Sequence, residues 1–169
     1  MRICESGMMF GDYEPSNCFR IEKTKLYKKL NGKGYSSVEF ILHKPDEKQL
    51  LFIEAKSSLP AIDSVDKYDE QIAGIANDFR DSFQLACGIW FGQHNGKVDM
   101  PENALHFFSY GTQVVFVLVI KNRTGKLTSI AEEIKQKLLK EYRLWQFKVL
   151  VLNENDARTH NLVVSEEQI

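Results

Sequence analysis

The chain has 169 residues, of which 43% are hydrophobic and 27% are charged, and its formal net charge is −1. This length favours one domain, so we expect residues 1–169 to form a single unit with a substantial core. The near-neutral charge argues against a general polyanion binder. No apolar run approaches the ~18 residues of a membrane span, and the first ten residues lack the apolar core of a secretory signal. We therefore expect a cytoplasmic protein without a membrane partner.

The first third of the chain predicts an irregular start, then a strand that leads into a helix. Residues 1–18 contain Gly, Pro and Asn breakers, and they predict loop or short helix. In CFRIEKTKLYKKLN, residues 18–31, the alternation of Phe19 and Ile21 gives way to helical spacing of later apolar residues. The NGKG sequence that follows predicts a turn.

The stretch SSVEFILHKPDEKQLLFIEAKSS, residues 36–58, predicts two apolar strands around a polar turn. Glu39 interrupts the first apolar run and Glu54 interrupts the second, with Lys56 two residues later. If the turn centres on the Asp-Glu pair, the register places Glu39 directly opposite Glu54. Two carboxylates side by side are destabilising without a positive charge beside them. Lys56 projects from the same strand face as Glu54.

A divalent cation is a simple partner for this pair of carboxylates. Mg²⁺ is usually held by one or two carboxylates together with water and phosphate oxygens. Lys56 would then orient or help to deprotonate an attacking water, or stabilise the charge that grows on phosphorus oxygens. The alternative interpretation is an ion-pair row on an exposed edge strand. The apolar flanks LLFI and VEFIL argue against it, because they predict that these charges are partly buried.

The second half predicts alternating helices and strands. Residues 68–88 place their apolar side chains on one helical face, and residues 89–108 are broken by Gly, Asn and Pro into a connection with a short strand or helical turn. The β-branched run of residues 112–122 predicts a strand covered on both faces. A helix over residues 127–143 and a last buried strand over residues 147–153 follow. Strand, helix and strand with short links predict a right-handed crossover between parallel strands.

These residues resemble the PD-(D/E)xK, or restriction-endonuclease-like, nuclease superfamily. Its signature is an acidic residue in one strand, a hairpin, and (D/E)xK in the next strand, usually followed by a helix. Here VEF offers Glu39, and IEAK offers Glu54 and Lys56. The resemblance covers about residues 19–152 and implies an α/β fold with an αβββαβ core, a mixed central sheet flanked by helices. It also implies a metal-dependent nuclease in which Glu39 and Glu54 hold Mg²⁺ or Mn²⁺ and Lys56 assists water attack.

The resemblance implies two further site residues, and the sequence departs from the family pattern because no Pro precedes the first acid. The first acid is Glu39 where Asp is commoner in the family. Many members carry another Glu on an N-terminal helix; Glu5, Glu14 and Glu22 compete for that role, and Glu22 is favoured because it lies beside a basic segment and closest to the hairpin. Some members use a polar residue on the helix after the motif, and Gln71 is the candidate by position.

The basic segment before the hairpin predicts a phosphate-binding surface near the acidic site. Its five candidate residues are Arg20, Lys23, Lys25, Lys28 and Lys29. A solvated, lysine-rich helix face is the alternative interpretation. Asp78 and Asp81, on the polar side of the next helix, are interpreted as solvent-facing or capping residues.

Two functions stay open at the level of sequence. The first is hydrolysis of phosphodiester bonds in nucleic acid, with DNA favoured over RNA. The second is a catalytically inactive nuclease-like fold that serves as a nucleic-acid or protein binding module, because a fold does not fix a function. The chain leaves little room for a separate sequence-reading domain, so a homodimer or a larger complex would supply specificity.

Overall fold

A computed structural model describes residues 1–61, 64–93, 100–101, 107–109 and 111–164 of the chain. Its centre is a five-stranded sheet in the order β3-β4-β5-β6-β7. The strands are β1 (Ile3–Glu5), β2 (Met8–Phe10), β3 (Cys18–Phe19), β4 (Phe40–Lys44), β5 (Gln49–Lys56), β6 (Gln113–Ile120) and β7 (Lys148–Asn153). The α-helices are α1 (Lys25–Leu30), α2 (Val65–Trp90), α3 (Leu127–Lys137), α4 (Leu139–Trp145) and α5 (Glu154–Thr159), and two 3₁₀ turns cover Pro15–Asn17 and Ile21–Lys23.

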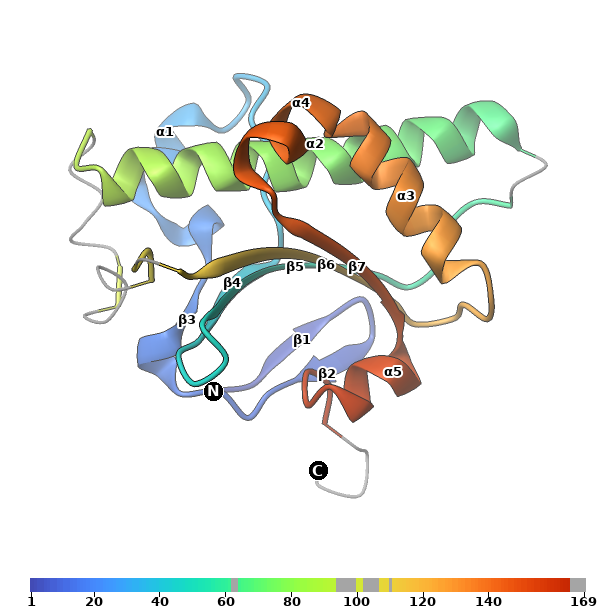
Figure 1. Cartoon of the computed structure of the whole chain (residues 1–169), viewed down its shortest axis with the longest axis horizontal. Coiled ribbons are helices and arrows are strands. Elements are labelled where there is room, and N and C mark those ends of the chain that lie inside the picture. Colours follow the sequence, from blue (N-terminus) through green and yellow to red (C-terminus); the bar gives the residue numbers. More distant parts are fainter. Residues whose placement is uncertain (62–63, 94–99, 102–106, 110, 165–169) are drawn as a thin grey trace.

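The sheet joins an antiparallel half to a parallel half. β4 pairs antiparallel with both β3 and β5, whereas β6 runs parallel to β5 and to β7. Within the hairpin His43 lies opposite Leu50, which is the predicted register. The mixed α/β class, the hairpin and the parallel extension by β6 and β7 are therefore confirmed. Helices α1 to α4 cover one face of the sheet, and the β1–β2 hairpin and α5 lie on the other (Figure 1).

Helix α2 supplies most of the core on its side of the sheet. It begins at Val65 and ends at Trp90, so it extends the predicted helix at both ends and takes in the start of the predicted connection. Phe79 is fully buried and stacks on Phe116 of β6, with ring centroids 4.9 Å apart. Aromatic contacts of this kind fix the position of the helix across the strands. Much of the predicted connection, at residues 94–99 and 102–106, lies outside the described residues.

Two predictions about the C-terminal half need correction. The predicted helix of residues 127–143 is two helices, because Leu138 leaves helical geometry with φ −107° and ψ 21°. At this break Leu138 is fully buried, and the carbonyl of Lys137 accepts a hydrogen bond of 2.9 Å from Arg80. The last strand is not buried throughout: β7 is a sheet edge, and only Val151 and Leu152 have buried side chains. In contrast, β6 is buried from its second residue to its last, as predicted for a strand covered on both faces.

The N-terminal segment was predicted to be loop or short helix, and this is wrong for its first ten residues. They form the β1–β2 hairpin, in which Ser6 and Gly7 make a two-residue turn with φ of 51° and 73°. Positive φ at both central residues suits the twist of a tight hairpin. The buried side chains of Met8 and Phe10 face the sheet, and Phe10 meets Phe40 edge to face at 5.3 Å.

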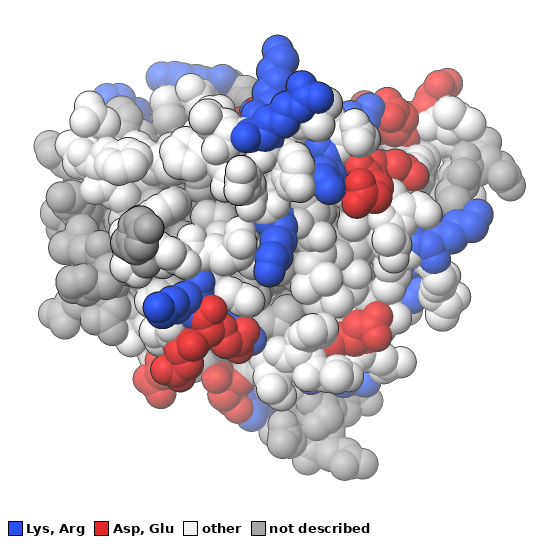
Figure 2. Space-filling model, in the orientation of Figure 1, with Lys and Arg blue, Asp and Glu red and all other residues white. Residues whose placement is uncertain are grey.

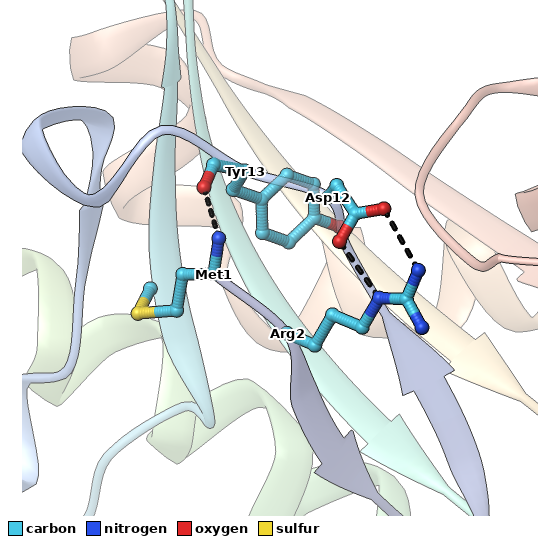
Figure 3. A network of polar contacts seen from close by, with 4 residues as sticks. All are labelled: Met1, Arg2, Asp12 and Tyr13. Carbon is cyan, nitrogen blue, oxygen red and sulfur yellow. Dashed lines mark hydrogen bonds and ion pairs between the residues drawn. The ribbon is translucent and has the colours of Figure 1, made fainter. Parts of the chain in front are cut away.

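Polar contacts tie the base of this hairpin together (Figure 3). Arg2 donates to both carboxylate oxygens of Asp12, at 2.7 and 3.1 Å, and the amino group of Met1 donates to the carbonyl of Tyr13. The Tyr13 hydroxyl donates in turn to the carbonyl of Leu162 at 2.6 Å. The hairpin is thereby held to the segment after α5. None of the described helices combines the length and apolar character that a membrane span requires.

Candidate active site

Glu54 and Lys56 lie at the C-terminal end of β5, on the face that α2 covers. Leu50 and Phe52 of the same strand face belong to the core with α2, so the alternation of the strand directs Glu54 and Lys56 toward the helix as well. The Glu54 side chain is only 2% exposed, and its Oε1 accepts a hydrogen bond from Lys56 Nζ at 2.5 Å. The prediction that these charges are partly buried is confirmed.

Glu39 lies immediately before β4, beside the strand that carries Glu54. Its backbone N–H donates to the carbonyl of Ile53 at 3.1 Å, which ties it to β5. The Glu39 carboxyl group also forms a hydrogen bond with Glu5, from the β1–β2 hairpin. Burial and the Glu5 charge raise the pKa of Glu39 to about 7, against the opposing charge of Lys56.

The pKa of Glu54 is raised even though a lysine is its direct partner. Burial is the main cause and raises the pKa to about 8, while the charge and hydrogen bond of Lys56 oppose the rise and the charges of Asp78 and Glu39 add to it. Burial also disfavours the Lys56 ammonium, but Glu54 outweighs that effect and raises the pKa of Lys56. The site therefore holds more carboxyl groups than its nearby cation neutralises, which is the condition that favours a further cation.

Asp78 is a member of this site that the sequence analysis did not recognise. It was interpreted as solvent-facing or capping, but it is partly buried, and its charge acts on both Glu54 and Lys56. Burial raises the pKa of Asp78, against a hydrogen bond from Ser36 and the charge of Lys56. Asp81, one turn later on α2, accepts from the backbone N–H of Ser36 at 2.9 Å, so it fixes the loop before β4 to the helix. The signal for Asp78 was its position seven residues after Gln71, which places both on one face of α2.

A groove opens beside Lys56. It has a volume of about 540 Å³, and its walls include Lys56, Lys67, Gln71, Gly74 and Asp78. A Cβ added at Gly74 would meet no atom within 4 Å, so the helix leaves open space there. Gln71 and Lys56 both line this groove. The polar residue predicted on the helix after the motif is therefore on the same groove as the predicted lysine.

Arg20 and Glu22 lie together at the margin of the site. One guanidinium nitrogen of Arg20 lies 2.7 Å from Glu5 Oε1 and 2.9 Å from Glu22 Oε1. The charge of Arg20 is thus compensated by carboxylates of the protein, and its side chain is 21% exposed. Arg20 therefore differs from the freely exposed cation that the predicted phosphate contact requires. Of the N-terminal glutamates, Glu5 contacts Glu39 directly, whereas Glu22 meets the site through Arg20.

The remaining members of the basic segment lie on the surface. Lys23, Lys25, Lys28 and Lys29 are all exposed. Among the described residues, the ammonium groups of Lys23, Lys28 and Lys29 have neither an ion-pair nor a hydrogen-bond partner. Basic side chains gather along the upper edge of the face in Figure 2, where α1 and α4 lie in Figure 1.

Glu39 and Glu54 provide an open set of metal donors and not a closed cage. Within the described ranges, no group of three or more His, Cys, Asp or Glu side chains is arranged to hold a metal ion. Two carboxylates nevertheless fit Mg²⁺ or Mn²⁺, since water and substrate phosphate oxygens usually complete the shell of such ions. Comparisons with protein-family models, with curated proteins and with solved structures give no match to this chain.

Proposed function

We propose that the protein is a metal-dependent nuclease that hydrolyses phosphodiester bonds in nucleic acid, with DNA favoured over RNA. The observation that carries the proposal is the buried Glu54 paired with Lys56 at the end of β5, near Glu39, with Lys56 on the wall of a groove. A buried carboxylate and lysine in an otherwise apolar strand serve chemistry better than they serve stability.

The order of elements supports a restriction-endonuclease-like core. Strands β3, β4 and β5 form an antiparallel meander, α2 follows, and β6 returns parallel to β5. One difference from the αβββαβ order is that α1 lies between β3 and β4 and not before the meander. The meander and the crossover are the parts that position Glu39, Glu54 and Lys56, and this difference leaves them intact.

In this proposal Glu39 and Glu54 hold Mg²⁺ or Mn²⁺. A divalent cation bound there would supply Lewis-acid polarisation of a phosphoryl oxygen. Both carboxyl groups must be ionised to act as ligands, and burial raises the pKa of each, to about 7 for Glu39 and about 8 for Glu54. Ion binding therefore releases protons from the protein near neutral pH.

Lys56 acts as the catalytic lysine. Its pKa is raised by Glu54, so it is a cation at neutral pH and suits the stabilisation of negative charge on phosphorus oxygens or the orientation of a water. Gln71 and Asp78 line the same groove as Lys56, and in this proposal they help to orient that water. Glu22 steadies Arg20, which in turn contacts Glu5. A homodimer or a larger complex would add specificity.

A second function, a nuclease-like fold that only binds nucleic acid or protein, has one observation in its favour. Lys56 already donates a hydrogen bond to Glu54, and the Glu39 carboxyl group has a hydrogen bond with Glu5, so the carboxyl groups have partners without an ion. Under this alternative the site is structural, and a metal has no effect on it.

Cleavage assays with the purified protein test the proposal. Circular DNA, linear DNA and RNA are each incubated with Mg²⁺, with Mn²⁺ and with a chelator. We expect metal-dependent cleavage that is lost in Glu54→Gln and kept in Glu70→Gln, because Glu70 is an exposed glutamate on the wall of the same groove. Cleavage that is absent with every substrate, or that survives in Glu54→Gln, contradicts the proposal.

A further inference from the structure

The segment of residues 31–37, NGKGYSS, joins α1 to the approach to β4 and leads directly to Glu39. Gly32 and Gly34 have φ of 77° and 86°, and neither has an atom within 4 Å of an added Cβ. The first five of these residues are exposed. The middle of the segment is thus an open, turning loop that stands clear of the rest of the protein.

The end of this loop is fixed to α2 beside the proposed active site. Ser36 donates from its backbone N–H and its hydroxyl to Asp81 Oδ2, at 2.9 and 3.2 Å. Two residues later, the N–H of Val38 donates to the hydroxyl of the buried Ser82 at 2.8 Å. Ser36 also forms a hydrogen bond with Asp78, which is a wall of the groove that contains Lys56. The loop is therefore held at the mouth of that groove.

Tyr35 is presented to solvent at this position. Its side chain is 40% exposed, and within the described part of the chain its hydroxyl has no hydrogen-bond partner. It immediately precedes Ser36, the residue that ties the loop to α2. Among the described residues no aromatic ring stacks on Tyr35, whereas Val38, three residues later, is buried.

Three cations precede Tyr35 along the chain. Lys28 and Lys29 lie in the last turn of helix α1, and Lys33 lies in the loop. All three are exposed. Their ammonium groups have no ion-pair or hydrogen-bond partner among the described residues. The stretch of residues 28–35 thus carries unpaired lysines and an exposed aromatic ring, which are the two components of single-strand binding: the cations follow phosphates and the ring stacks on a base.

From this arrangement we infer that the substrate of the proposed nuclease is single-stranded nucleic acid, with one unpaired base stacked on Tyr35 and neighbouring phosphates on Lys28, Lys29 and Lys33. The inference rests on the proposed function, because it concerns what the same site takes in. A duplex hides the faces of its bases within the stack, so only an unpaired base can cover the Tyr35 ring. The loop would then direct the strand past Asp78 toward Lys56.

Binding measured without cleavage tests the inference. The probes are fluorescein-labelled oligodeoxythymidine and oligouridine of about 12 nucleotides, within the site size of small single-strand binders, and a blunt DNA duplex of equal length, all with chelator present. We expect the protein to prefer a single strand, and Tyr35→Ala to weaken that binding by about 5- to 150-fold. Tyr35→Phe keeps the ring and should stay within about twofold of the parent. Phe91→Ala removes an aromatic side chain that is 69% exposed just after α2 ends, and serves as the matched control.

The outcomes separate this inference from the function on which it rests. Equal affinity for duplex and single strands, or unchanged single-strand binding in Tyr35→Ala, overturns the single-strand inference, and metal-dependent cleavage of duplex DNA would still support the nuclease. No binding to any nucleic acid overturns both. A thermal melt of Tyr35→Ala that matches the parent shows that the variant is folded, which we expect because the lost ring is exposed and makes no hydrogen bond with described residues.

Discussion

The ion pair of Glu54 and Lys56 gives the sharpest prediction, because a catalytic pair and a structural pair respond differently to a metal. In Lys56→Met the long apolar stem is kept and the charge is removed, whereas Glu54→Gln keeps the shape and removes the metal ligand. If the site is catalytic, both variants lose cleavage. Only Glu54→Gln also loses stabilisation by Mn²⁺, because Lys56 is a positive charge near the ion and its removal favours ion binding.

The expected magnitudes follow from the burial of Glu54. Breaking a buried pair costs about 3–5 kcal/mol when the remaining charge stays buried, and since Lys56 is 28% exposed the lower end applies. Glu54 can avoid most of this cost by protonation, since burial already raises its pKa to about 8. Lys56→Met should therefore lose little stability near pH 6 and more as the pH rises, by at most about 1.4 kcal/mol per pH unit.

Melts with and without Mn²⁺ measure these effects. At free Mn²⁺ of about 100 times Kd, the parent and Lys56→Met should each gain about 2.7 kcal/mol, and Glu54→Gln should gain almost nothing. Lys67→Met and Glu70→Gln are matched controls, because both residues line the same groove and are exposed. A parent that Mn²⁺ does not stabilise, with two destabilised variants, would identify a plain ion pair and end the nuclease hypothesis.

Three further predictions use other features of the site. The metal-free protein should lose stability as pH rises from about 5 to 8. The folded state keeps protons on Glu39 and Glu54, whose pKa values are about 7 and 8, at pH values where the unfolded chain has already lost them. Urea titrations across this range should show a shallower loss of stability in Glu54→Gln. Gly74→Ala should raise the unfolding free energy by about 1 kcal/mol, since the added methyl meets open space, while Gly74→Trp fills the groove and should block cleavage in the same assay without unfolding the protein. Changing Lys23, Lys28 and Lys29 to Gln should lower the slope of the log of the nucleic-acid binding constant against the log of the salt concentration by about 2 to 3. An unchanged slope would assign these lysines to a solvated surface.

The hairpin and crossover could be predicted because their apolar patterns are long. The strands around the Asp-Glu turn and the face of α2 each repeat the signal several times, and the turn fixes the register that places His43 opposite Leu50. The β1–β2 hairpin was missed because its strands have three residues each, too few for a period of two to show. Its turn also uses Ser6, which is not a usual residue for positive φ.

The site was harder to predict than the strands that carry it. Glu54 and Lys56 interrupt an apolar run, so the local pattern marks them. Asp78 lies on the polar side of a helix, where acidic residues are normal, and only its position in space relative to Lys56 distinguishes it. Glu5 reaches Glu39 from a hairpin on the other face of the sheet, and no spacing in the sequence encodes that contact.

The pairing of Arg20 with Glu5 changes how the charges of the site are understood. The sequence suggested a basic surface beside an acidic one, but Arg20 lies within hydrogen-bonding distance of Glu5 and Glu22 and so belongs to the acidic site. Lys56 and Arg20 each compensate part of a carboxyl cluster, and burial keeps the pKa of Glu39 and Glu54 high despite them. A core built for stability alone would be as stable with apolar side chains in these positions. In the proposed function, the excess of buried carboxyl groups over cations serves to bind a metal ion, and the lysines of α1 contact the substrate.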